Sequence, residues 1–249
     1  MFCNHWCSWY TGKSYLINAL RNLLQNKCAV TATTGKASYN TKVVTIYSLL
    51  KLPEGPKGND DLSGQSLLRL QENTKDVDYV LVDEYSILGQ TAFGWIDKCC
   101  KQDKALYDKV HGGLSEILID DPGQLQSVAD KPLYHAQPSN TIGEQGYLTY
   151  EMFDKVVKLT VSQRVQGCSL EQQEFRDLLL RLRKGEPTIK DWQLLLTRQP
   201  SKVENIAEFD SAIKLFYSNE EVSSYNYDQL NKLRQPCANI QCTSFIICS

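Results

Sequence analysis

The sequence lacks several features that would place it in a specialised class of protein. Its 27 basic residues are outnumbered by 29 acidic ones, and the net charge of −2 gives no overall positive field for nucleic acid or an acidic membrane. No apolar run reaches the roughly 18 residues of a membrane-spanning helix, and residues 1–10 lack the basic start and apolar core of a secretory signal. We therefore expect an intracellular protein with no membrane partner, in which any DNA contact comes from local groups.

Cysteine spacing typical of a metal site or a disulfide framework is also absent. The nine cysteines include no Cys-x-x-Cys pair, so in a reducing compartment they are expected to be free thiols. The nearest approach to a ligand cluster is Cys3, His5 and Cys7 at one end, with Cys237, Cys242 and Cys248 at the other. Because both spacings are poor for zinc, we expect no zinc site there.

What is present is an ordinary globular composition organised around residues 79–88. A hydrophobic share of 42% over 249 residues is enough for one large domain or two small ones. The run Tyr-Val-Leu-Val predicts a buried parallel strand that ends in Asp83 and Glu84. At the ligand-binding edge of an α/β sheet, Asp83 could hold a metal ion and Glu84 could orient or deprotonate a water. By itself the pair is also typical of a solvated strand end.

A second signal lies at Thr11-Gly12-Lys13-Ser14, followed by leucines and isoleucine at helical spacing. Gly-Lys-Ser at a helix start is the end of a phosphate-binding loop, in which the lysine reaches phosphates and the serine binds magnesium. The glycine expected five residues before Gly12 is replaced by Cys7, and only six residues precede it, so we expect the strand before the loop to be missing or a stub. Alone, this motif is also compatible with a polar helix start.

Further elements alternate along the chain in an α/β order. Apolar runs predict strands over residues 28–34, 114–119, 156–161 and 212–217, and helical spacing or caps predict helices over 15–24, 65–71, 92–100, 169–184 and 218–233. Glu116 falls inside a predicted strand, where a buried charge costs several kcal/mol unless it is paired.

Taken in order, six stretches resemble the petite-integration-frequency family of ATP-dependent DNA helicases, in the RecD-like branch of superfamily 1. They are TGKSYLINAL at 11, TTGKASYN with TIYSLLKLP at 33–53, YVLVDEYSIL at 79, GGLSEILIDDPGQLQSVADKPLY at 112, KLTVSQR at 158 and AIKLFYSNEEV at 212. The resemblance implies an α/β fold, with a RecA-like P-loop sheet flanked by helices over residues 1–157 and an incomplete second RecA-like domain over 158–249.

The resemblance also implies a function and a set of site residues. The family moves 5′ to 3′ along single-stranded DNA with ATP and Mg²⁺ and serves DNA repair, recombination and telomere maintenance. By position in the family motifs, nucleotide would be bound by Thr11, Gly12, Lys13 and Ser14, and magnesium by Ser14 and Asp83. In catalysis, Glu84 would act as the base, Gln124 would sense the terminal phosphate, and Arg164 would serve as the arginine finger. The stretches at 34–38 and 45–48 match family segments that touch DNA. The expected partners are single-stranded or 5′-tailed duplex DNA, bound weakly by a monomer in the nucleus or the mitochondrion.

Departures from the family pattern leave a second interpretation open. Cys7, Ser8 and Tyr10 replace loop glycines, and Asp120 replaces a glycine in the fourth stretch, which begins at residue 112. The later family motifs are not in the sequence. A truncated, catalytically inactive remnant that acts as a binding or structural module is therefore the alternative, and weak ATP binding without unwinding is expected. An ATPase or kinase unrelated to DNA is a third possibility, disfavoured by the ordered helicase stretches.

Overall fold

The computed structural model describes residues 3–7, 12–52, 61–121, 123–159, 169–209 and 212–233. The chain divides into two compact units, Met1–Glu186 and Pro187–Ser249. The first unit contains the parallel sheet, and the second contains helices. The sequence-based boundary between residues 157 and 158 stays a prediction. Among the described residues, no helix is both long enough and apolar enough to cross a membrane.

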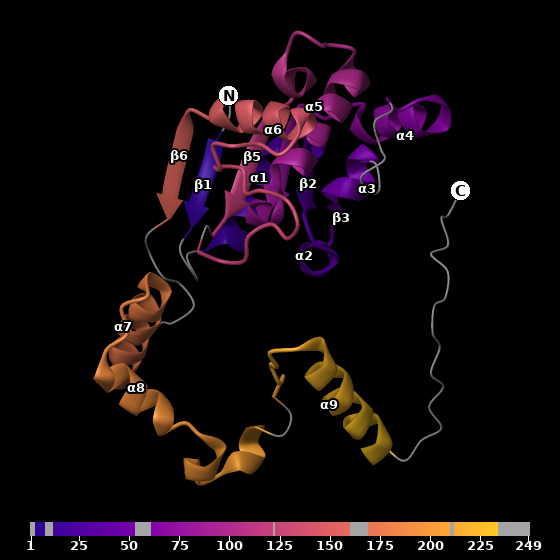
Figure 1. Ribbon diagram of the computed structural model, residues 1–249. Helices are drawn as coiled ribbons and strands as arrows, with labels where there is room; N and C mark the ends of the chain where they lie inside the picture. The colour runs from indigo at the N-terminus through magenta and orange to yellow at the C-terminus, as the bar shows by residue number, and fades with distance from the viewer. Residues whose placement is uncertain are drawn as a thin grey trace. The chain divides into compact units, whose positions relative to one another are not determined.

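The first unit is built on a six-stranded sheet in which each named strand pairs in parallel with its neighbours. The strands are β1 (Cys3–Cys7), β2 (Cys28–Ala32), β3 (Val44–Thr45), β4 (Tyr79–Asp83), β5 (Ser115–Asp120) and β6 (Lys155–Leu159). Their order across the sheet is β3-β2-β4-β5-β1-β6, and Figure 1 shows β6 and β1 side by side at one edge. This confirms the predicted α/β class.

Helices follow most of the strands. In the first unit they are α1 (Lys13–Leu24), α2 (Gly35–Thr41), α3 (Ile46–Leu50), α4 (Gly64–Thr74), α5 (Gln90–Lys104), α6 (Thr141–Glu151) and α7 (Leu170–Lys184). The second unit contains α8 (Ile189–Leu196) and α9 (Asn219–Lys232). The predicted N-caps of α7 and α9 are present, and Ser218 forms a capping box with Glu221. The capping box predicted for Ser169 with Gln172 is only half formed, because Ser169 accepts from the Gln172 backbone N–H without a reciprocal bond.

The two faces of β4 are buried against different helices, because successive side chains of a strand point in opposite directions. Val80 and Val82 belong to a large core that includes Phe93 of α5. Leu81 belongs to a smaller core with Ile17 of α1. Burial on both faces explains why this strand reads as a continuous apolar run.

Helices α5 and α6 approach closely because each supplies a glycine at the crossing. A Cβ at Gly94 would lie 2.0 Å from the carbonyl oxygen of Ile142, and one at Gly146 would lie 2.0 Å from that of Gln90. Both obstacles are backbone atoms, so any side chain here would force the helices apart.

Two sequence-based expectations about strands are wrong. The strand before the phosphate loop is neither missing nor a stub: β1 has five residues and pairs with both β5 and β6. Conversely, residues 212–217 form no strand, although their apolar pattern predicts one. These residues belong to the second unit, whose described part contains helices and no strand. An apolar run needs a partner strand for its backbone hydrogen bonds if it is to become part of a sheet.

Candidate functional site

The carboxyl ends of the central strands and the start of α1 meet at one edge of the sheet. The register pairs Asp83 of β4 with Ile119 of β5, so Asp83 and Asp120 end their strands at nearly the same level. Helix α1 begins at Lys13 after β1, which pairs with β5. In parallel α/β sheets this edge is where ligands bind.

Lys13 and Asp83 form an ion pair at this edge. Lys13 Nζ lies 3.4 Å from Asp83 Oδ1, and the two side chains are 22% and 9% exposed. Burial raises the pKa of Asp83 above its usual value, and the Lys13 ammonium opposes that shift. The neighbouring Glu84 carboxylate raises the pKa further. The ammonium therefore helps to keep a largely buried carboxylate ionised, which is the state required to bind a metal ion.

The start of α1 is suited to an anion. Gly12 precedes the helix with a left-handed φ of 88° and caps it without a side-chain hydrogen bond. This backbone conformation favours glycine. The first-turn N–H groups, together with the partial positive charge of the helix N-terminus, can then receive phosphate oxygens. Ser14 is exposed in the same turn. Ser14 and Asp83 each offer an oxygen atom of the kind that magnesium prefers, so these groups could hold a phosphate and a magnesium ion.

Glu84 is fixed next to Asp83 by its backbone and its side chain. Its φ of 58° is unusual for a residue other than glycine, and its N–H donates to the carbonyl oxygen of Ile119 (3.0 Å) and to Asp83 Oδ1 (3.0 Å). Glu84 Oε2 accepts a hydrogen bond from the Thr34 hydroxyl at 3.1 Å. The carboxylate therefore has a defined orientation at the sheet edge. A residue that positions a water molecule needs such a fixed orientation.

Thr34 connects this carboxylate to a second motif. Its Oγ1 also accepts from the Ala37 backbone N–H at 3.2 Å, which caps α2. One hydroxyl thus donates to Glu84 and holds the first turn of the Thr34–Ser38 segment. Sequence reasoning predicted a role for each segment but missed this contact, because the two residues lie 50 positions apart.

Asp120 and Asp121 were not predicted as site residues, although both are almost fully buried at the end of β5. Asp120 Oδ2 accepts from the Ser86 backbone N–H, and Lys13 acts to lower the pKa of Asp120, which burial raises. Asp121 instead forms a two-point ion pair with Arg183 of α7, with Arg183 Nη1 at 2.5 Å from Oδ2. The signal available in the sequence was two carboxylates ending a strand, the same signal that selected Asp83 and Glu84.

Of the remaining predicted residues the structure describes only Gln124, and its side chain does not contact the Lys13–Asp83 pair. Gln124 lies on the loop after β5, where its N–H donates to the carbonyl oxygen of Asp121 (2.9 Å) and its side chain is exposed. Within the described part of the chain, its amide forms no hydrogen bond with Lys13, Asp83 or Glu84. Thr11 and Arg164 lie outside the described residues.

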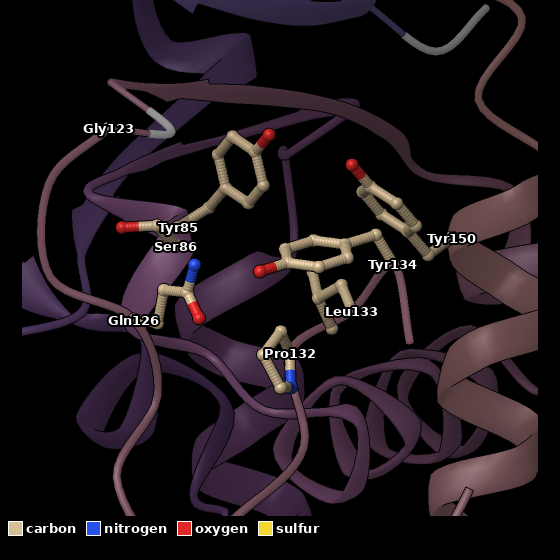
Figure 2. Close-up of a pocket in the computed structure, with 8 residues that line it drawn as sticks. All are labelled: Tyr85, Ser86, Gly123, Gln126, Pro132, Leu133, Tyr134 and Tyr150. Atoms are coloured by element: carbon tan, nitrogen blue, oxygen red, sulfur yellow. The ribbon is translucent and has the colours of Figure 1, made fainter. Parts of the chain in front are cut away.

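A pocket of about 330 Å³ lies immediately beyond Glu84. Figure 2 shows tyrosine rings bordering it from three parts of the chain. Its lining consists of Tyr85, Ser86, Gly123, Gln126, Pro132, Leu133, Tyr134 and Tyr150. An apolar lining with several tyrosine rings suits a flat aromatic group such as a nucleobase.

Comparison with known proteins identifies relatives of this chain. The family model described as PIF1-like helicase matches residues 6–193. A curated relative, the ATP-dependent DNA helicase PIF1 of Trypanosoma brucei brucei, is 25% identical over 229 residues, which are 90% of this chain and 21% of that protein. The chain therefore spans about a fifth of the length of this relative.

Solved structures show the same fold. A Pif1 helicase from Bacteroides in complex with ADP-AlF3 and ssDNA matches 94% of this chain and 54% of its own, with 22% identity and a TM-score of 0.70. The Pif1 helicase from Candida albicans matches 95% of this chain and 51% of its own, with 21% identity and a TM-score of 0.68. The chain spans about half the length of these structures.

Proposed function

Because this chain belongs to the PIF1-like helicase family, we propose that it binds ATP and magnesium at the Lys13–Asp83 edge and uses ATP hydrolysis to act on DNA. The observation that carries the proposal is the convergence of Lys13, Asp83 and Glu84 at the carboxyl ends of the parallel strands. The similar Bacteroides structure contains ADP-AlF3 and ssDNA, which supports these two classes of ligand.

In this proposal each residue has a defined task. Lys13 would leave Asp83 to bind phosphate oxygens, and Asp83 and Ser14 would hold the magnesium ion. Bound magnesium supplies positive charge that neutralises the phosphate oxygens. Glu84, held by Thr34, orients the attacking water and accepts its proton. Gln124 and Arg164 would then contact the terminal phosphate when the site closes around the nucleotide.

The contact between Thr34 and Glu84 supports a link between hydrolysis and DNA binding. The Thr34–Ser38 segment resembles a family stretch that touches DNA, and its first turn shares the Thr34 hydroxyl with the proposed base. A shift of α2 on DNA binding would therefore alter the orientation of Glu84. The finer assignments rest on the family resemblance: 5′-to-3′ movement on single-stranded or 5′-tailed DNA, in repair, recombination or telomere maintenance, by a nuclear monomer.

The test is a Mg-ATP titration of the full chain beside Lys13→Ala. Loss of one charge-assisted contact of about 1.5–3 kcal/mol should weaken binding by roughly tenfold or more. Lys27→Ala is the matched control, because Lys27 pairs with Asp78 at 3.0 Å just before β2 and β4, at the opposite edge of the sheet. Equal ATP affinity in wild type and Lys13→Ala would contradict the proposal.

A second candidate, a remnant that no longer hydrolyses ATP, is favoured by Asp120. This carboxylate lies where the family pattern has glycine, at the end of β5 and nearly level with Asp83, the partner of Lys13. Its negative charge opposes the phosphates that Lys13 should bind. Asp120→Asn keeps the shape and removes the charge, so it should tighten Mg-ATP binding. If Asp120→Asn binds ATP but neither it nor wild type hydrolyses ATP with DNA present, the remnant is the better description.

A further inference from the structure

A second cluster of polar side chains lies inside the first unit, away from the nucleotide edge. Cys100 of α5, His111 of the short 3-10 helix η3 (Val110–Gly113) and Glu116 of β5 are each 0% exposed. One potential ligand atom from each lies within 4.8 Å of the other two. Glu116 precedes Asp120 by four positions on β5, so the cluster lies about 13 Å along the strand from that carboxylate.

The carboxyl group of Glu116 is the unusual member. Its Oε1 lies 3.1 Å from His111 Nδ1. Among the described residues, however, neither Glu116 oxygen has a partner in hydrogen-bonding geometry. A buried carboxyl group without hydrogen bonds costs several kcal/mol, and native proteins rarely retain one. The contact with the imidazole therefore offsets only part of the cost of burying this carboxyl group.

We propose that Cys100, His111 and Glu116 bind a zinc ion. Sulfur, imidazole nitrogen and carboxylate oxygen are the three donor types that protein zinc sites use. A thiolate and a carboxylate carry two negative charges and a neutral imidazole carries none, so the three ligands balance a divalent cation. Such a neutral assembly can be buried at far lower cost than separate charges.

The surroundings of the cluster are arranged as a supporting shell. Asp97, which is also buried, accepts from the His111 backbone N–H at 2.7 Å and from Lys101 Nζ at 2.7 Å. Gln145 of α6 donates to the same carboxylate at 3.1 Å. Because Asp97 already has these three donors, it positions the His111 loop and does not need to bind the metal. Outer partners of this kind orient metal ligands.

The geometry requires only a small contraction. A tetrahedral zinc ion with bonds of about 2.0–2.3 Å separates its ligand atoms by roughly 3.3–3.8 Å. Ligand atoms that lie as much as 4.8 Å apart would therefore move together by about 1 Å, whereas Glu116 Oε1 and His111 Nδ1, at 3.1 Å, are already close enough. The loop is already pressed against α5, since a Cβ at Gly112 would lie 2.3 Å from the Cys100 carbonyl oxygen. The ion would connect α5, the loop and β5.

The test measures zinc content in the full chain after exhaustive dialysis, by mass spectrometry of the metal. Wild type should retain one zinc per chain. Cys100→Ser and Glu116→Gln should each retain at least tenfold less. Cys99→Ser is the matched control, because Cys99 is buried on the same helix but outside the cluster. It should retain zinc like wild type.

Cobalt substitution separates this site from adventitious binding by the other cysteines. Wild type and Cys99→Ser loaded with Co²⁺ should show a thiolate-to-cobalt charge-transfer band, and Cys100→Ser should not. Glu116→Gln has nearly the shape of a protonated glutamic acid but lacks the carboxylate. It therefore tests whether the Glu116 carboxylate binds zinc even if Cys100→Ser fails to fold. Absence of zinc from wild type, or equal zinc in wild type and Glu116→Gln, would overturn the proposal.

Discussion

Removing the Thr34 hydroxyl should break the contact between the Glu84 carboxylate, at the proposed nucleotide site, and the Thr34–Ser38 segment. That segment resembles a family stretch that touches DNA. Thr34→Val has nearly the same shape but can neither donate to Glu84 Oε2 nor accept from the Ala37 N–H. The variant should therefore lose the cap of α2 and leave the Glu84 carboxylate free to rotate.

The size of the effect follows from the two lost hydrogen bonds. An N-cap contributes about 0.5–2 kcal/mol. A hydrogen bond to a charged group contributes about 1.5–3 kcal/mol. Both residues are only partly buried, so the lower end of each range applies. We expect a loss of about 2 kcal/mol in the free energy of unfolding, and a change of roughly 30-fold in any equilibrium that depends on both contacts.

The assay pairs chemical denaturation with ATP hydrolysis measured with and without single-stranded DNA. Thr34→Ser keeps both hydrogen bonds and should resemble wild type. Thr33→Val is the matched control, because the Thr33 hydroxyl donates to the backbone carbonyl of Glu84 at 2.8 Å and not to its carboxylate. It should lose stability but keep the DNA response. The reasoning is refuted if Thr34→Val is as stable as wild type, or if it responds to DNA as fully as Thr33→Val.

Two further predictions concern the loop and the helix crossing. Replacing Cys7, Ser8 and Tyr10 together by glycine should tighten Mg-ATP binding, because glycine lets backbone N–H groups turn toward phosphates; unchanged affinity in a titration would show that these side chains are not the obstacle. Gly146→Ala should destabilise the fold by about 1–3 kcal/mol in chemical denaturation, because its Cβ meets backbone at 2.0 Å. Gly143→Ala, whose Cβ would meet its neighbours at 3.4 Å or more, should cost less; equal losses would contradict the close-crossing explanation.

Much of the sheet could be predicted because buried parallel strands have a local signature. The apolar run ending at Asp83 corresponds to β4, and its burial on both faces explains the pattern. The strand before the phosphate loop was underestimated because only six residues precede Cys7. Its place was decided by pairing with β5 and β6, strands more than a hundred positions away. Residues 212–217 show the converse, an apolar run that forms no strand in a unit whose described part contains only helices.

The site was predictable where residues follow strand ends and was missed where contacts join distant segments. The Lys13–Asp83 pair follows from the rule that ligands bind at the carboxyl edge of such sheets. The bond between Thr34 and Glu84 and the pair of Asp121 with Arg183 join residues 50 and 62 positions apart. Neither pair has a local pattern. Glu116 was recognised as a problem in the sequence, but its partner His111 emerged only from the fold.

The contacts at this edge also indicate what limits nucleotide binding. An ATP complex must first separate Lys13 from Asp83, an ion pair at 3.4 Å whose carboxylate is largely buried. Magnesium would replace the lysine as the partner of Asp83, so little of the pairing energy is lost. The obstacles to ATP binding that remain are the buried carboxylate of Asp120 and the replacement of loop glycines by Cys7, Ser8 and Tyr10 in the sequence. ATP affinity should therefore respond more strongly to Asp120→Asn and to restored glycines than to any change that merely weakens the Lys13–Asp83 pair.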